Sequence, residues 1–232
     1  MTTPNLDLPY IAQGQAQKEV THNDALNLLD TFVQMAVESR SETSPPGSPS
    51  DGEVYIPASG ATGAWSGWDF NLAVARDGAW TKIVPKRGMK AWVKDERLSV
   101  IYEDSVWRDG VAVTQHGGRI TLRAKEEELT LTGAFVETSA DFIPDRAIVL
   151  GVASRTTQAI TGGTSYDVGV SGEANKFGGS LGISLGSTNI GVIGPTAYYA
   201  DTKVRATANG SNFTGGKVRL VVYFLEMSAP TA

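Results

Sequence analysis

The segment from Thr21 to Arg40, THNDALNLLDTFVQMAVESR, constrains the fold most, because it is the one convincing helix among predicted strands and turns. Thr21 begins a motif that resembles a capping box, and the prolines that follow the segment prevent the helix from continuing. With residues placed about 100° apart, the apolar side chains between Ala25 and Val37 cover an arc of roughly 200°. A helix that packs on one core needs a stripe of only about 100°.

We therefore expect this helix to pack against its own domain on one side and against other copies of the chain on the other. The alternative is a helix that is sunk deeper than usual in its own domain. The side chains expected to anchor and oligomerise the chain come from this helix and from the segment before it. They are Leu8, Tyr10, Ile11, Leu26, Leu29, Phe32, Val33 and Val37.

Local composition divides the chain into five predicted parts. Residues 1–20 contain two prolines and few large apolar groups, which predicts an extended anchoring arm. Residues 21–40 form the oligomerisation helix, and residues 41–50 form a Pro/Ser linker that we expect to be a stiff spacer. A β-hairpin repeat module over 51–116 and a β-sandwich over 117–232 follow.

The repeat module is predicted from two similar strings. Asp77-Gly78-Ala79-Trp80 and Asp104-Ser105-Val106-Trp107 lie 27 residues apart, and each places a tight turn before a strand that carries a tryptophan. We expect the tryptophans to be core residues, with Trp68 as the exception. The five tryptophans of the chain are Trp65, Trp68, Trp80, Trp92 and Trp107.

The carboxy-terminal half consists of short alternating stretches separated by Gly, Asn, Asp and Pro. Seven such stretches from Leu129 onward predict an antiparallel sandwich or jelly roll. The predicted fold class is therefore mainly β, with an amino-terminal arm, one amphipathic helix, a small β-hairpin repeat module and a carboxy-terminal antiparallel β-sandwich.

Composition excludes several functional classes. The net charge is -5 and no Lys/Arg run exceeds two residues, so nucleic acid is not an expected partner. No apolar run approaches the ~18 residues of a membrane span, and no signal peptide is recognisable, so we expect synthesis in a cytoplasm and no membrane partner. With no Cys and two His, neither a metal site nor a cofactor is expected.

The expected function is binding rather than catalysis. Gly182-Ile183-Ser184-Leu185-Gly186 matches the nucleophile elbow of hydrolases, but no helix or downstream His accompanies it. No catalytic residue is therefore assigned, and the chain is not expected to be an enzyme. A polysaccharide depolymerase with two carboxylates is the alternative. Its candidate residues lie in predicted loops or strand ends and are Asp141, Asp145, Asp167, Glu173 and Asp201.

A glycan-binding surface is predicted for the loops of the sandwich. They combine flat aromatic faces with planar groups that form hydrogen bonds, which is the chemistry of sugar recognition. The same tyrosines can instead be structural plugs. The predicted glycan-binding residues are Tyr166, Asp167, Asn175, Lys176, Tyr198, Tyr199 and Asp201.

Several strings together resemble one known family. They are Leu8-Pro9-Tyr10-Ile11-Ala12, the run from Gln15 to Asn23, Asp51-Gly52 before Val54-Tyr55-Ile56, Gly63-Ala64-Trp65, Ile143-Pro144-Asp145-Arg146-Ala147, Phe177-Gly178-Gly179-Ser180-Leu181-Gly182 and Gly194-Pro195-Thr196-Ala197-Tyr198-Tyr199. The chain thereby resembles proteins encoded in prophages and gene transfer agents of alphaproteobacteria, some of them particle-surface spikes or fibres.

The resemblance implies a structural component of a phage or phage-like particle, such as a head spike, a fibre or a vertex decoration. It implies a homo-oligomer, a trimer or a pentamer, that contacts a capsid or tail protein and touches host-surface polysaccharide. The expected location is the particle surface. A purely architectural protein without a ligand is a further alternative.

Overall fold

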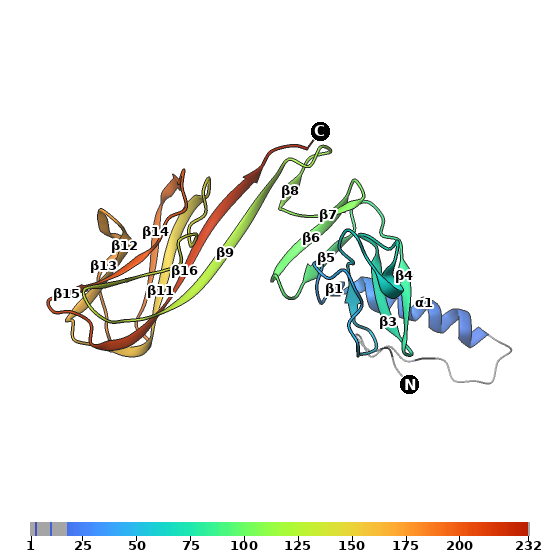
Figure 1. Ribbon diagram of the computed structural model, residues 1–232, viewed down its shortest axis with the longest axis horizontal. Coiled ribbons are helices and arrows are strands. Elements are labelled where there is room, and N and C mark those ends of the chain that lie inside the picture. The colour runs from blue at the N-terminus through green and yellow to red at the C-terminus, as the bar shows by residue number, and fades with distance from the viewer. Residues whose placement is uncertain (1–2, 4–9, 11–17, 232) are drawn as a thin grey trace. The chain divides into compact units, whose positions relative to one another are not determined.

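The computed structural model describes Thr3, Tyr10 and residues 18–231, and the chain forms two compact units, residues 1–117 and 118–232 (Figure 1). The fold is mainly β, as predicted, and the described residues contain one α-helix, which lies near the amino terminus. The division falls between Gly117 and Gly118, where two consecutive glycines interrupt the strand-forming sequence.

The first unit contains the helix and two small sheets. Its sheets have the strand orders β2-β3-β4 and β1-β5-β6-β7, and their pairs are antiparallel except for β1 with β5. A 3₁₀ turn spans Gly63–Trp65. The elements are α1 (Lys18–Val33), β1 (Ala36–Val37), β2 (Val54–Tyr55), β3 (Leu72–Arg76), β4 (Ala79–Ile83), β5 (Lys90–Val93), β6 (Leu98–Glu103), β7 (Val106–Asp109) and β8 (Ala112–Val113).

The two predicted hairpins are present as β3–β4 and β6–β7. At each turn both central residues have positive φ: 49° and 72° for Asp77 and Gly78, and 48° and 64° for Asp104 and Ser105. This is the conformation of a type I′ turn, whose twist matches that of the flanking strands. Asp and Gly tolerate it well, which explains why the turn signal in the sequence was reliable.

The predicted helix over 21–40 was too long at its carboxy end. The helix ends at Val33, and β1 follows at Ala36–Val37. In and around this strand, Met35, Val37 and Ser39 are buried. The amide of Trp92 donates to the Met35 carbonyl at 2.8 Å and the amide of Lys94 to the Val37 carbonyl at 2.9 Å. Burial at every second residue is a strand pattern, so sheet pairing replaces two predicted turns of helix.

The composition of residues 41–50 predicted a stiff spacer outside the core, and the structure shows how its backbone is held. The amide of Ala58 donates to the Glu42 carbonyl at 2.8 Å, and the amide of Thr62 donates to the Thr43 carbonyl at 2.7 Å. Proline and serine therefore prevent regular structure here, but the backbone is fastened to the residues that follow β2.

Two apolar clusters hold the first unit together. The larger one lies between the two sheets and includes Val37, Leu72 and Val93. In the smaller one, the Trp65 indole lies 5.4 Å from the Tyr55 ring and 5.0 Å from the Trp80 ring, centroid to centroid. Trp65 is completely buried, as predicted for a core residue, whereas the exposed tryptophan is Trp92 and not the predicted Trp68.

The second unit is a β-sandwich. One sheet contains the strands in the order β14-β11-β16-β9, and the other has the order β10-β15-β12-β13. The strands are β9 (Arg119–Thr130), β10 (Phe135–Glu137), β11 (Ile148–Thr161), β12 (Ser165–Val170), β13 (Glu173–Leu181), β14 (Thr188–Ala197), β15 (Arg205–Asn209) and β16 (Gly215–Ser228).

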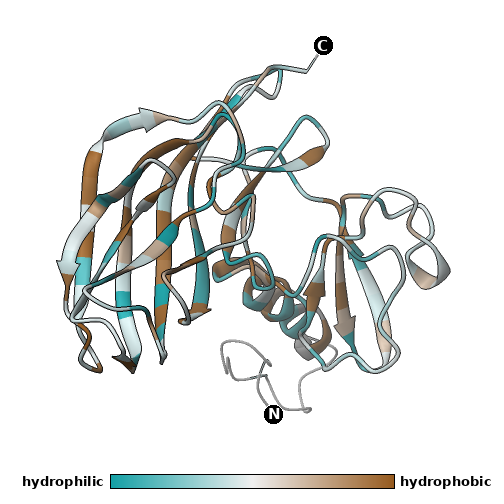
Figure 2. Ribbon diagram, turned by 60° about the vertical axis from the view of Figure 1, so that its left-hand side comes forward, coloured by the Kyte–Doolittle hydropathy of each residue, from teal (hydrophilic) through white to brown (hydrophobic). Residues whose placement is uncertain are grey.

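The strand order is that of a jelly roll, because consecutive strands β9–β10, β11–β12, β13–β14 and β15–β16 lie in opposite sheets. The core between the sheets includes the fully buried Phe142, Val168 and Leu220. Hydrophobic segments alternate with polar ones along the sandwich strands in Figure 2, the pattern of strands with two different faces. The described residues 118–231 give eight strands rather than the seven predicted stretches, because ELTLTGAFVET contains the end of β9 and all of β10.

We predict that Trp65→Ala lowers the free energy of unfolding of the first unit by about 3–5 kcal/mol, because it removes a fully buried aromatic side chain. Val111→Ala is the control: its side chain is 77% exposed and belongs to neither apolar cluster, and we expect a loss below about 1 kcal/mol. Urea unfolding followed by far-ultraviolet circular dichroism measures both values. Equal losses in the two variants would contradict this account of the core.

Candidate functional site

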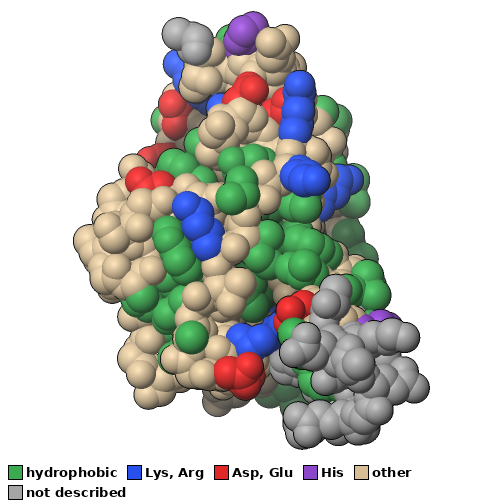
Figure 3. All heavy atoms as spheres, turned by 90° about the vertical axis from the view of Figure 1, so that its right-hand side faces the viewer, with side chains coloured by type: hydrophobic (Ala, Val, Ile, Leu, Met, Phe, Trp, Pro, Cys, Tyr) green, Lys and Arg blue, Asp and Glu red, His purple; other side chains and the backbone are tan. Residues whose placement is uncertain are grey.

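An exposed apolar stripe on α1, formed by Ala25, Leu26, Leu29 and Val33, is the first part of the candidate site. Leu29 and Val33 are 48% and 58% exposed, and Leu26 is half-buried. The steps of three and four residues from Leu26 to Val33 are those of a coiled-coil seam. Figure 3 shows one face of the protein, on which hydrophobic side chains lie between charged ones. We call this line of residues the α1 stripe.

On another side of α1, polar side chains are buried. Asp30 is 1% and Thr31 is 3% exposed. The Thr3 hydroxyl donates to the Asp30 carboxylate at 2.7 Å, and the Tyr10 hydroxyl donates to the Asn27 side-chain oxygen. The two described residues that precede the helix thus cover its polar side. Such burial satisfies the polar groups but leaves the apolar side in contact with water.

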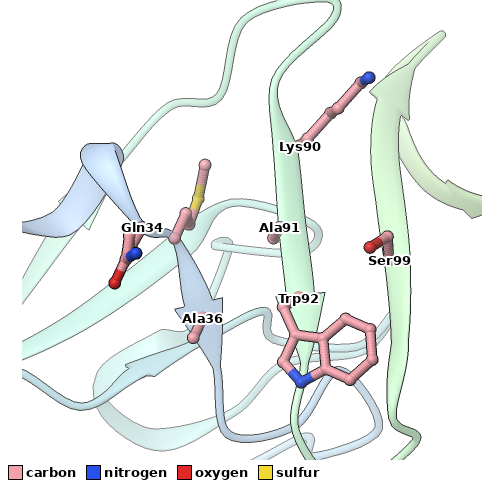
Figure 4. Close-up of a pocket in the computed structure, with 7 residues that line it drawn as sticks. Gln34, Ala36, Lys90, Ala91, Trp92 and Ser99 are labelled. Atoms are coloured by element: carbon pink, nitrogen blue, oxygen red, sulfur yellow. The ribbon is translucent and has the colours of Figure 1, made fainter.

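A shallow depression of about 410 Å³ lies where α1 ends (Figure 4). Gln34, the residue after Val33, lines this depression, which therefore lies beside the carboxy end of α1. The Trp92 indole lies along β5 at its edge and is 44% exposed, which is unusual for so large an aromatic group. The lining residues are Gln34, Met35, Ala36, Lys90, Ala91, Trp92 and Ser99. We call the α1 stripe and this depression together the assembly surface.

The residues predicted for oligomerisation are only partly brought together. Leu29 and Val33 are exposed on the α1 stripe with Leu26, whereas Phe32 packs against the larger core cluster of the first unit. Val37 was assigned wrongly, since it lies in β1 and is fully buried within its own chain. The predicted Leu8 and Ile11 lie outside the described residues.

Trp92 is the part of the assembly surface that sequence reasoning missed. In β5 the side chains of Ala91 and Val93 are buried, and those of Lys90 and Trp92 alternate with them on the outer side. This alternation in Lys-Ala-Trp-Val was the available signal. It was outweighed by the expectation that a tryptophan within a repeat belongs to the core.

The predicted glycan-binding residue Tyr166 cannot contact a glycan, because it is 1% exposed and its hydroxyl lies 3.3 Å from the Ser154 hydroxyl in the sandwich core. Tyr166 and Val168 alternate inward along β12, and Asp167 between them points outward. The Asp167 carboxylate accepts hydrogen bonds at 2.7 Å from the Ser180 amide and from the Asn209 side chain. Asp167 therefore connects three strands of its sheet.

The remaining predicted glycan-binding residues are more accessible. Tyr199 is 80% exposed, and Asn175 and Asp201 are exposed as well. Lys176 forms an ion pair with Glu173 at 2.8 Å, and its charge acts on the neighbouring Tyr198 hydroxyl. Burial raises the pKa of that hydroxyl, an effect that Lys176 opposes. Tyr198 and Lys176 thus lie together, with the exposed Tyr199 beside them in the chain.

The carboxylates considered for catalysis each have a partner. The Lys125 ammonium forms an ion pair with Asp141 at 2.7 Å and lowers the pKa of that carboxyl group. Asp201 accepts a hydrogen bond from the Asp145 amide at 2.9 Å, and Glu173 is paired with Lys176. A glycosidase requires a carboxylic acid whose pKa is raised. Among the described residues, hydrogen bonds instead lower the pKa of four carboxyl groups, those of Asp69, Glu128, Glu137 and Asp141.

Neither a metal-binding cluster nor a membrane-spanning helix is present in the part of the chain that the structure describes. Within it, His, Asp and Glu side chains form no group of three or more that could hold a metal ion. The same residues contain no helix that is both long and apolar enough to cross a membrane.

Comparisons with known proteins find a matching family model and similar solved structures. Residues 22–108 match the model of a family described as "Protein of unknown function (DUF2793)", and this range lies within the first unit. Among solved structures, the chain is similar to a chain of the cyanophage Pam1 capsid asymmetric unit. The identity is 20%, the TM-score is 0.36, and the match covers 51% of this chain and 94% of that one. No curated protein matches.

The Tyr198 hydroxyl provides a test of the glycan region. Its oxygen is buried and has no hydrogen-bond partner among the described residues. We predict that Tyr198→Phe raises the free energy of unfolding by about 1 kcal/mol, because an unsatisfied polar group is removed. Tyr199→Phe is the control at an exposed position and should change stability very little. Urea titration measures both variants, and a loss of stability in Tyr198→Phe would show that the hydroxyl is satisfied in solution.

Proposed function

We propose that this protein is a structural component of a phage or phage-like particle that forms a homo-oligomer through its first unit. The observation that carries the proposal is the exposed α1 stripe. A single copy buries the polar Asp30 and Thr31 and leaves Leu29 and Val33 in water. Apolar side chains at coiled-coil spacing gain free energy when identical helices pack along them. The assembly surface is thus suited to a second copy of the same helix.

The sandwich supports the proposal as a fold-level analogy. Jelly rolls are common in viral capsid and lectin domains, but the fold alone does not determine function. The sequence resemblance to prophage and gene transfer agent proteins points in the same direction. The proposed position is a head spike, fibre or vertex decoration that contacts a capsid or tail protein, on the surface of a particle assembled in a bacterial cytoplasm.

We further propose that the second unit contacts host-surface polysaccharide and does not cleave it. Tyr199 offers an exposed aromatic face, and Lys176 and Asn175 offer hydrogen-bond donors on neighbouring positions of β13. Sugar rings stack on such faces while their hydroxyl groups bond to planar or charged groups. The candidate carboxylates described above are engaged in ion pairs or hydrogen bonds, which favours binding over acid catalysis.

The assembly role predicts a concentration-dependent oligomer. Wild-type protein should sediment as a multiple of 24.6 kDa, and Leu29→Lys combined with Val33→Lys should raise the dissociation constant at least tenfold. The dissociation constant rises because contact between two such helices would bury the ammonium groups of the introduced lysines. Lysine is a good helix former, so α1 itself should remain intact.

The matched control replaces Val84 and Val111 with Lys. These valines are 66% and 77% exposed in the first unit but lie outside the assembly surface, so the oligomer should persist. Sedimentation velocity over a range of concentrations measures all three proteins. A wild-type chain that remains a 24.6 kDa monomer throughout would refute the assembly role.

The glycan role predicts that Tyr199→Ala combined with Lys176→Ala abolishes retention on immobilised bacterial surface polysaccharides that retain the wild type. Leu185→Ala is the control, because Leu185 is 69% exposed in the same unit without being part of the predicted glycan-binding set. Bio-layer interferometry measures retention, and an assay for reducing ends detects cleavage. Sugar release that stops when Asp141 or Asp201 is replaced by Ala would favour a depolymerase instead.

A further inference from the structure

We infer that the outer face of the β14-β11-β16-β9 sheet is a second self-association surface, on which copies of the chain pack sheet against sheet. This inference rests on the proposed function in one respect, because contact between α1 helices brings the sheets of different copies close together. The residues of this outer sheet face are Leu122, Ala124, Leu150, Ala153, Ile190, Val192, Val221, Tyr223 and Leu225.

Strand register places these residues in adjacent rows across the sheet. One row runs from Ile190 through Ala153 to Val221, since Ala153 is opposite both of the other two. The next row runs from Val192 through Gly151 to Tyr223 and Ala124. In a third row Leu225 is opposite Leu122. Glu126, which is opposite Val221, adds a carboxylate at the β9 end of the first row. Side chains directly opposite one another on one face interact, so the other positions of the rows form an apolar surface with this carboxylate at its edge.

Gly151 gives this surface its shape. It has no side chain, and a Cβ at this position would lie 2.6 Å from the Gly191 carbonyl oxygen. A depression of about 230 Å³, which Gly151 lines, lies between Val192 and Tyr223. A sheet face with such a depression can interdigitate with the side chains of a second sheet, as in the packing of two sheets within a sandwich.

Large apolar side chains on this face are exposed to solvent. Ile190 is 77%, Val192 76%, Leu122 59% and Tyr223 42% exposed, although all four lie in regular strands. Contiguous apolar patches of more than a few hundred Å² mark interaction sites on soluble proteins. The outer sheet face thus has the apolar character that a specific contact requires.

The charges beside the apolar rows favour a second copy as the occupant. The adjacent row contains both signs: Arg155 is opposite Arg219, and Arg219 forms an ion pair with Glu128 at 3.0 Å. Lys217 pairs with the same Glu128 at 3.2 Å. A surface for nucleic acid or for an acidic partner would carry one sign. A border with both signs can face an identical border without net repulsion.

Both apolar surfaces belong to one chain, and this strengthens each of them. Copies joined at the assembly surface hold their sandwiches at a high effective concentration, which reaches the millimolar range for short connections. A sheet contact that would be weak between free chains then becomes populated. The two surfaces together specify self-association better than either surface does alone.

Cross-linking tests this contact directly, because the chain contains no Cys and one introduced thiol reports on one position. The Ile190→Cys variant should form disulfide-linked dimers under mild oxidation at least tenfold faster than Leu185→Cys. Leu185 is 69% exposed in the turn between β13 and β14 and provides the matched control. A single thiol can only link two chains, so a face covered by another part of the same chain would react slowly and overturn the inference.

Ile190→Thr combined with Val192→Thr keeps the β-branched shape and should raise the dissociation constant of the oligomer about tenfold without changing the urea midpoint at low protein concentration. Slow cross-linking and an unchanged dissociation constant in a chain that still forms oligomers would overturn the sheet contact and leave assembly through α1 standing. A wild type that is monomeric and does not cross-link would overturn both.

Discussion

The pairing of residues 35–39 between two sheets is the constraint on which the first unit depends. On one side, the carbonyls of Met35 and Val37 accept hydrogen bonds from the strand β5, and on the other the Glu38 amide donates to the Val54 carbonyl at 2.8 Å. Residues that serve both sheets cannot remain helical, so α1 ends at Val33. The same pairing buries Val37 and fixes where the helix leaves the core. The two-residue strand β1 therefore determines where α1 ends, and with it which side chains of α1 are buried within the chain.

α1 packs on the core through Phe32, but elsewhere it buries polar side chains such as Asp30 and leaves apolar ones in water. Burial of Asp30 requires hydrogen bonds in compensation, and the Thr3 hydroxyl supplies one of them. Leu29 and Val33 receive no such compensation in a single copy. These exposed apolar side chains are the feature on which the proposed contact between copies of α1 rests. The exposed Trp92 at the end of the α1 stripe is explained in the same way.

Local sequence patterns predicted the fold correctly in segments whose pattern fits only one type of secondary structure. Asp77-Gly78 gave the correct hairpin because its positive φ values suit few other turns, and alternation gave the mainly β class and the sandwich. The prediction failed where a segment fits two periods: the apolar residues from Met35 to Val37 suit a helix and a strand equally, and only pairing with β5 decides. Tyr166 failed for a related reason, since a tyrosine in a strand can point to either face and the position of its neighbour Val168 determines which.

Two modest apolar surfaces on separately folded units have a physical advantage over one large surface. A helical stripe of four residues offers little area by itself, and association must offset the lost rotational and translational freedom of each copy. Once one surface has formed its contact, that cost does not recur in full for the second, because both surfaces belong to the same chain. Affinity then rises with the product of two weak contacts, and assembly becomes steep in concentration. In the assembly that we propose, copies would therefore stay dispersed at low concentration and associate steeply as their concentration rises.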